Sequence, residues 1–233
     1  APGGGWWTGV VPGTFTATSE IFYPVSGATL GGAYDGSSAW SFSAPLLRDG
    51  YSYRVRVWAV DNAKPGGNVE TAISSITFIY DATPPVVSVS RPVGERYYGQ
   101  NSSEGDYYLG VLDGSSSDAF GIARAEIQIY DVTMSSYWHT TGWTVGVSSW
   151  HYTGGTSWSY APPAFVDGYR YRLEARAFDI AGNMSAYATS YFYYDINKPA
   201  AAQQRPGAAG FYTVLRQVSG TAADPAGSGP FKS

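Results

Sequence analysis

The sequence predicts an all-β protein made of tandem β-sandwich modules. Short segments that alternate apolar and polar residues are separated by clusters of Gly, Pro, Ser and Asp, with 29 Gly and 14 Pro among 233 residues. No segment shows a comparable helical period. Aromatic residues make up 16% of the chain and charged residues 14%, so there is enough apolar surface for a core.

An internal repeat gives the modular organisation. Residues 40–61 align without a gap onto residues 158–179, and residues 78–85 align onto 192–199 after an insertion of Lys64-Pro65-Gly66. The aligned positions share residue types: Trp40 and Trp158, Pro45 and Pro163, Asp49 and Asp167, Tyr51 and Tyr169, Asn68 and Asn183, Phe78 and Phe192, Tyr80 and Tyr194, Asp81 and Asp195. Self-similarity at a long fixed period is typical of an array of like modules.

The first module, residues 1–83, is expected to lack its opening strands. Trp6-Trp7 aligns with Tyr137-Trp138, which lies well inside the second module. The spacing from Trp7 to Trp40 is longer than the equivalent spacing, and the extra residues 13–25 are a candidate replacement strand. Its repeated strand places Tyr51, Tyr53, Val55, Val57 and Ala59 on the inward face.

The second module, residues 84–199, is expected to be complete. Its predicted strands are 86–91, 107–112, 122–130, 137–144, 156–160, 169–178 and 189–194. In strand 169–178 the side chains of Tyr171, Leu173 and Ala175 alternate with charged ones, which is typical of a half-buried antiparallel strand. Trp158 is expected in the core, and Tyr169 is expected to bond back across the corner that opens its strand.

The stretches Ala177 to Asn183 ("AFDIAGN") and Asp195 to Pro199 ("DINKP") carry a resemblance to a known family. They resemble the tandem bacterial immunoglobulin-like modules of secreted and cell-surface proteins. This resemblance implies immunoglobulin-like sandwiches and an extracellular or cell-surface location. It leaves the function open, because such modules serve as spacers, adhesins and binding domains alike.

The tail, residues 200–233, is expected to begin a third module. Arg205-Pro206 matches Arg91-Pro92, Phe211-Tyr212 matches Tyr97-Tyr98, and residues 218–224 resemble residues 112–118. The tail therefore carries equivalents of opening strands, although it contains no equivalent of residues 125–131.

These features suggest a function. Two strands alone are marginally stable in water, and an incomplete sandwich exposes strand edges and core. A tail that completes the first module of the next subunit by strand donation would cover both surfaces and build a head-to-tail homopolymer. The expected interface residues are Phe211, Tyr212, Val214, Leu215 and Val218. We expect an extracellular filament or stalk. A fragment of a longer tandem array would show the same incomplete first and last modules.

The sequence gives little support to several other classes of function. The formal net charge is −4 with no basic run, which argues against nucleic acid and anionic membrane surfaces as partners. No apolar run approaches the ~18 residues of a membrane span. The two histidines, His139 and His151, belong to no catalytic motif, so neither enzymatic activity nor a cofactor is expected. Cysteine is absent, which leaves the cellular compartment open.

The sequence favours neither a calcium site nor a Lys–Asn cross-link. Asp179 and Asn183 lie in one loop and Asp113 and Asp118 in another, but calcium needs six to eight oxygens and neither loop alone provides them. These residue types also favour tight turns, which is the preferred interpretation. A Lys–Asn cross-link is not favoured, because Lys is scarce and Lys198 lies in an expected linker.

A carbohydrate-binding or adhesive module is the alternative function. The candidate sugar-stacking residues are Trp58, Trp143, Trp150 and Tyr152, although Tyr and Trp are equally typical of protein interfaces. Surface glycans are possible partners on this interpretation. Asn101 and Asn183 begin short sequons and are candidate glycosylation sites.

Overall fold

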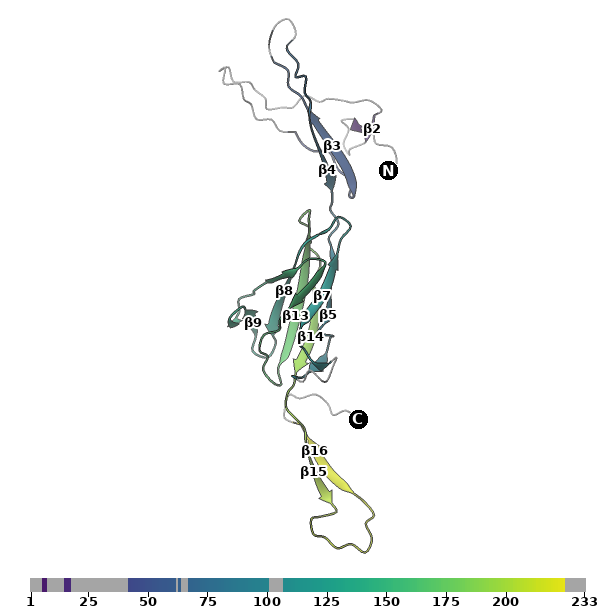
Figure 1. Ribbon diagram of the computed structural model, residues 1–233, viewed down its shortest axis with the longest axis vertical. Coiled ribbons are helices and arrows are strands. Elements are labelled where there is room, and N and C mark those ends of the chain that lie inside the picture. Colours follow the sequence, from purple (N-terminus) through teal and green to yellow (C-terminus); the bar gives the residue numbers. More distant parts are fainter. Residues whose placement is uncertain are drawn as a thin grey trace. The chain divides into compact units, whose positions relative to one another are not determined.

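The computed structural model of the chain describes residues 6–7, 15–17, 42–61, 63, 67–100 and 107–224. The chain divides into two compact units, Ala1–Ala82 and Thr83–Ser233, which are described separately. The regular structure of the described residues consists of strands, so the all-β prediction is confirmed (Figure 1). In this part of the chain no helix is long and apolar enough to cross a bilayer.

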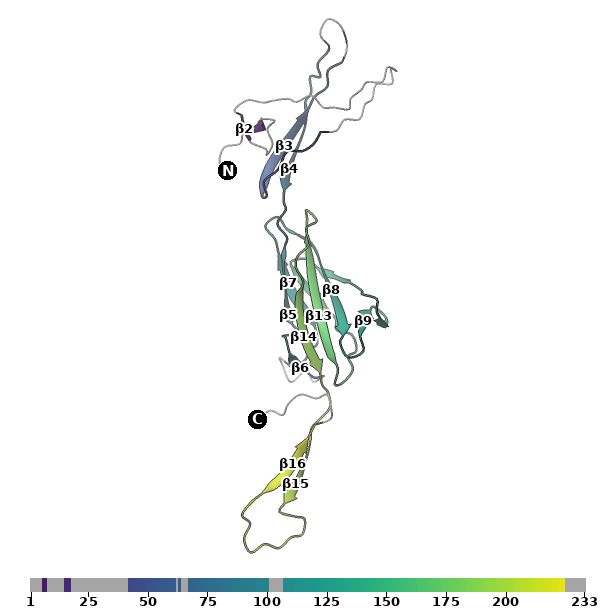
Figure 2. The same ribbon diagram turned by 180° about the vertical axis from the view of Figure 1, so that it is seen from behind.

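Ten strands of the second unit form one sheet, in the hydrogen-bonded order β5-β7-β12-β11-β8-β13-β14-β6, with β9 paired to β8 and β10 paired to β9. The strands are β5 (Val86–Arg91), β6 (Arg96–Tyr98), β7 (Leu112–Ser117), β8 (Ile122–Asp131), β9 (Ser136–His139), β10 (Gly142–Val145), β11 (His151–Gly154), β12 (Ser157–Tyr160), β13 (Arg170–Asp179) and β14 (Ala188–Tyr194). We call this sheet the central module. Neighbouring strands are antiparallel except β14 and β6, which run parallel (Figure 2).

The sheet of the central module curls back on itself. Strand β5 stands at one end of the hydrogen-bonded order, yet it contacts β13 and β14 near the other end. The buried core therefore lies between β5-β7-β12 and β8-β13-β14, and it includes Trp158, Leu112, Ile127, Tyr171 and Phe192. Burial alternates along the whole of β13, which confirms the predicted period of two.

Two strand predictions in the central module are wrong, and two strands were not predicted. The segment predicted at 107–112 becomes strand only at Leu112, and β7 continues to Ser117. The segment 137–144 is a hairpin of β9 and β10, not one strand. Neither β6 nor β11 was predicted: β6 pairs with β14, and β11 joins the two layers by pairing with both β8 and β12.

The corner of β13 is held by a different tyrosine from the one predicted. The hydroxyl of Tyr171 accepts a hydrogen bond from the Val166 amide at 2.8 Å. Tyr169 instead contributes backbone bonds, because its carbonyl accepts from the Tyr194 amide at 3.1 Å. The hydroxyl of Tyr171 reaches the amide because its side chain points into the core, where it is fully buried.

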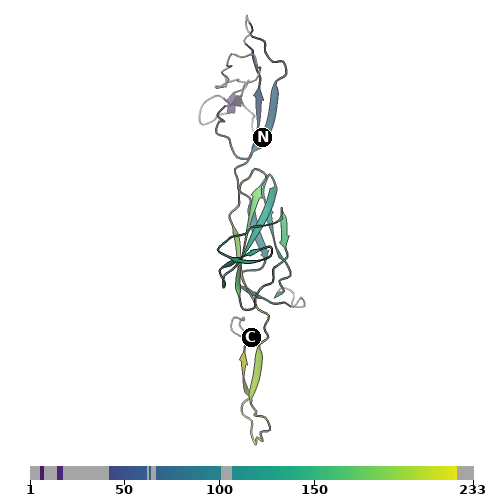
Figure 3. The same ribbon diagram turned by 90° about the vertical axis from the view of Figure 1, so that its left-hand side faces the viewer.

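The described strands of the first unit form two small sheets. Strand β1 (Trp6–Trp7) pairs with β2 (Phe15–Ala17), and β3 (Tyr51–Val57) pairs with β4 (Ser74–Tyr80). Of the candidate replacement strand 13–25, residues 15–17 form β2, and the rest lies outside the described residues. Figure 3 shows β3 and β4 side by side along their length.

The tail contains one further antiparallel pair, β15 (Ala200–Arg205) and β16 (Ser219–Ala223). A long connection links these two strands (Figure 1). The peptide bond before Pro206 is cis, as is the one before Pro92 in the central module.

Candidate assembly surfaces

The hairpin β3–β4 repeats the hairpin β13–β14 in register. Tyr53 is paired with Phe78, as its equivalent Tyr171 is paired with Phe192. The Tyr53 hydroxyl accepts from the Arg48 amide at 2.8 Å, which reproduces the bond from Val166 to Tyr171. The sequence repeat is therefore also a repeat of backbone geometry.

The inner face of this first hairpin is only partly covered, contrary to the prediction: Tyr53 and Val57 are half-buried, with the Phe15 ring 5.2 Å from that of Tyr53, and the rest of the face is exposed. Phe78 is 37% exposed, whereas its equivalent Phe192 is fully buried. Val55, Ile76 and Tyr80 are exposed in the same way, and their equivalents Leu173, Ser190 and Tyr194 are buried. In the central module this face is covered partly by β5, which packs on β13 and β14. In the first unit these four side chains form exposed apolar surface.

The tail hairpin repeats β5–β7 in register, including its irregularity. Ala200 pairs with Ala223 as Val86 pairs with Ser117, and Gln203 pairs with Gly220 as Val89 pairs with Gly114. Both pairs of strands then shift register one residue before the Arg-Pro dipeptide. A bulge at the same place bends both strands in the same way.

The connection that follows β15 repeats the one that follows β5. The Tyr212 hydroxyl accepts from the Gly207 amide at 2.7 Å, and the Tyr98 hydroxyl accepts from the Val93 amide at 2.7 Å. Tyr98 is 1% exposed and packs edge-on against Phe192, with ring centroids 6.0 Å apart. Tyr212 has the same local bond but is 47% exposed.

All five predicted interface residues are exposed: Phe211, Tyr212, Val214, Leu215 and Val218. Val218 is 70% exposed, and its equivalent Leu112 is fully buried. Leu215 aligns with Leu109, which is also buried. The alternation of residues alone could not place Leu215 and Val218 on one face, whereas their equivalents both lie in the core.

The exposed apolar residues of the first hairpin were not predicted as site residues. Ile76, Phe78 and Tyr80 lie along one side of β4. The sequence shows that these residues align with β14. It does not show that they are exposed, which depends on the tertiary structure.

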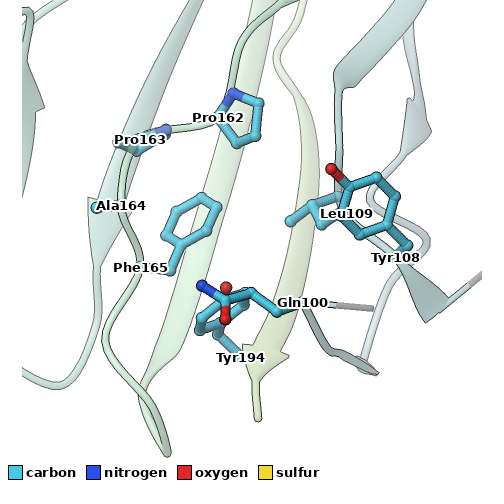
Figure 4. Close-up of a pocket in the computed structure, with 8 residues that line it drawn as sticks. All are labelled: Gln100, Tyr108, Leu109, Pro162, Pro163, Ala164, Phe165 and Tyr194. Carbon is cyan, nitrogen blue, oxygen red and sulfur yellow. The ribbon is translucent and has the colours of Figure 1, made fainter. Parts of the chain in front are cut away.

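A pocket of about 310 Å³ opens in the central module where the segment after β6 meets the segment before β13. Its lining residues are Gln100, Tyr108, Leu109, Pro162, Pro163, Ala164, Phe165 and Tyr194 (Figure 4). None of them carries a formal charge. The pocket lies between two parts of the module. Gln100, Tyr108 and Leu109 belong to the part that the tail repeats, and the other lining residues belong to the part that the first unit repeats.

Two of the candidate sugar-stacking residues are partly covered by protein. Trp143 packs at 5.5 Å from both Trp138 and Tyr171. Trp150 lies under the Arg176 guanidinium at 3.9 Å and beside Tyr187 at 5.3 Å. Trp58 and Tyr152 are exposed, but they belong to different units.

Of the acidic residues expected in loops, Asp179 and Asp118 are engaged in local turns, whereas Asp113 lies within β7, where it is paired with Arg91 and Ser159. The Asp179 carboxylate accepts from the amides of Gly182 and Asn183 and from the Asn183 side chain, at 2.6, 2.8 and 2.8 Å. Asp118 accepts from the Phe120 amide at 2.7 Å. The fold does bring the two loops together, because carboxylate oxygens of Asp118 and Asp179 lie within 4.8 Å of each other. Burial by itself raises the pKa of Asp179, but the bonds from Asn183 and the backbone outweigh it and hold the pKa below its usual range.

The equivalent turn of the first unit has the same bonds despite its inserted residues. The Asp61 carboxylate accepts from the Asn68 amide at 2.6 Å and from the Asn68 side chain at 2.8 Å. The backbone bond from Asn68 is the main cause that lowers the pKa of Asp61. The turn tolerates the insertion because its two ends keep these contacts.

The remaining candidates from the sequence are the two histidines and the two predicted glycosylation sites. His139 and His151 each donate a ring N–H to a backbone carbonyl, that of Val147 at 3.0 Å and that of Trp138 at 2.9 Å. The Asn183 amide group donates to Asp179, and glycosylation at Asn183 stays a prediction. Asn101 lies outside the described residues.

Comparison with known proteins does not add a family. No protein-family model matches the chain, and a search of the curated proteins finds no match.

Proposed function

We propose that this chain is a structural subunit of an extracellular filament or stalk, built of tandem immunoglobulin-like modules. Subunits join head to tail, and the tail of one completes the first module of the next by strand donation. The chain carries out no catalysis on this proposal. A heterologous contact of this kind propagates without limit unless it closes into a ring.

One observation carries the proposal. The tail hairpin and the first hairpin repeat the two halves of the central module that pack on each other, and several residues that are buried there, such as Phe192 and Leu112, have exposed equivalents in the repeats, Phe78 and Val218. Tyr98 packs on Phe192, while their equivalents Tyr212 and Phe78 each present a ring to solvent. Because these two surfaces repeat the halves of one core interface, we expect them to pack on each other.

Light scattering after size exclusion tests the proposal. We expect the full chain to form polymers and a chain ending at Pro199 to stay monomeric. A matched pair of full-length variants removes the effect of truncation: Val218→Glu places a carboxylate on the proposed interface, and Gln204→Glu places one on the exposed bulge of β15. Val218→Glu should abolish polymers and Gln204→Glu should not. A full chain that stays monomeric at high concentration would refute strand donation.

A further inference from the structure

The edge of the central sheet shows how the segment after β5 is held. Strand β6 runs parallel to β14, with Arg96, Tyr97 and Tyr98 paired with Phe192, Tyr193 and Tyr194 (Figure 2). The rings of Tyr97 and Tyr193 stack at 4.6 Å with 13° between their planes. Just before this pairing, the Glu95 amide donates to the Tyr191 carbonyl at 2.6 Å.

The tail has the same backbone shape before any partner is present. Ala209 has a φ of 57°, and its equivalent Glu95 has a φ of 55°. A left-handed conformation is uncommon for residues other than Gly, so its recurrence at the aligned position is a specific feature. The bond from Gly207 to the Tyr212 hydroxyl fixes the other end of the loop. Preorganisation of this kind lowers the entropy lost on binding.

The first unit has the matching edge. Within the described residues β4 pairs with β3 alone, in a sheet of two strands. In the central module the equivalent strand β14 has β13 on one side and β6 on the other. The edge of β4 along Phe78, Ile79 and Tyr80 is thus the position that a strand like β6 would fill.

From this we infer the register of the subunit contact, an inference that rests on the proposed function. Gly210, Phe211 and Tyr212 of one copy pair in parallel with Phe78, Ile79 and Tyr80 of a second copy. Phe211 lies over Ile79 as Tyr97 lies over Tyr193, and Tyr212 packs edge-on against Phe78. The Ala209 amide donates to the Thr77 carbonyl. A second copy is the occupant because the residues that complete this edge are those of the chain's own tail, held in the same conformation.

Because the chain has no cysteine, engineered thiols report the register without interference. The full-length double variant Ile79→Cys, Phe211→Cys places one thiol on each side of the inferred contact, within the Cα separation that a disulfide spans. In the variant Thr77→Cys, Phe211→Cys the thiol of the first hairpin is two residues away on the same face, about 7 Å along the strand. The variant Tyr97→Cys, Tyr193→Cys is the positive control within the central module.

We expect the Ile79, Phe211 variant to give a ladder of disulfide-linked multimers on a non-reducing gel under mild oxidation. The displaced pair should form links at least tenfold more slowly, and the control pair should form a link within one chain. Equal or faster linking of the displaced pair would overturn the register, as would a link between positions 79 and 211 inside a single chain. If the cysteine-free chain polymerises but the Ile79, Phe211 variant does not link, the register is wrong and the filament stands. If the cysteine-free chain does not polymerise and the Ile79, Phe211 variant does not link, both the register and the proposed filament are wrong.

Discussion

Single tyrosine hydroxyls fix the corners of this protein. The same arrangement, a hydroxyl that accepts from an amide five residues earlier, occurs at Tyr53, Tyr98, Tyr171 and Tyr212. In the central module the two tyrosines are buried, and in the tail and the first unit their equivalents are not. The local bond is therefore present at each corner whether or not tertiary packing covers it.

We expect Tyr171→Phe to destabilise the central module by about 1 to 3 kcal/mol, because the Val166 amide loses its partner in a part-buried position. Burial also raises the pKa of the Tyr171 hydroxyl, so it stays protonated over the working pH range. Urea unfolding followed by circular dichroism measures the loss. Tyr53→Phe removes the equivalent bond at an exposed corner, and a loss as large there would show that burial is not the cause.

At Asp179 we expect stability that depends on pH. Its pKa is lowered in the folded state, so its contribution is present above the unfolded value near 3.9 and is lost as the pH falls through the folded pKa. Asp179→Asn should therefore cost about 1 to 3 kcal/mol at pH 7, and the difference from the wild type should shrink below pH 4. Urea midpoints at pH 7, 4 and 3 measure this. A difference that stays constant with pH would contradict it.

At the scale of the elements, β7 is a strand because of what lies on either side of it. The sequence Leu112–Ser117 is poor in β-branched and aromatic residues, yet it pairs with β5 on one edge and β12 on the other. Gly114 permits this. A Cβ there would lie 2.0 Å from the Ser88 carbonyl oxygen and 2.2 Å from the Trp158 ring.

Gly114→Ala should therefore disrupt the central module, with a loss of several kcal/mol, because both neighbours are fixed in the fold. Gly142→Ala is the matched control, since a Cβ at Gly142 meets nothing within 4 Å. Thermal unfolding of the two full-length variants compares them. Similar melting temperatures would mean that the strands around Gly114 can move apart at little cost.

At the scale of the whole molecule, the proposed assembly links stability to concentration. A partner that binds only the folded state stabilises it, so the first unit should unfold at higher urea as the chain concentration rises. At a free chain concentration one hundred times the dissociation constant of the contact, the free energy of unfolding of the first unit should rise by about 2.7 kcal/mol. The central module, whose sheet already includes its own β6, should unfold at the same urea throughout.

Hydrogen exchange read by mass spectrometry at two concentrations separates the two units. Val218→Glu, which should block the contact, serves as the control and should remove the concentration dependence of β3 and β4. Protection of these strands that does not change with concentration in the wild-type chain would argue against a second copy as their partner.

The sequence by itself determined the all-β class, the repeat, most strands of the central module and the alternating face of β13. Each of these depends on local periodicity or on self-similarity, which are properties of the chain alone. It also aligned Val218 with Leu112, whereas the burial of Leu112 was known only from the structure.

Only the tertiary structure decided which faces are covered and which residues meet. Periodicity shows that Val55 shares a face with Tyr53, but whether that face is buried depends on strands far away in the sequence. For the same reason β7 was misplaced and β11 was missed, since both are strands through pairing on two edges and not through propensity. The approach of Asp118 to Asp179, and the parallel edge between β6 and β14, likewise arise from long-range packing that no local pattern encodes.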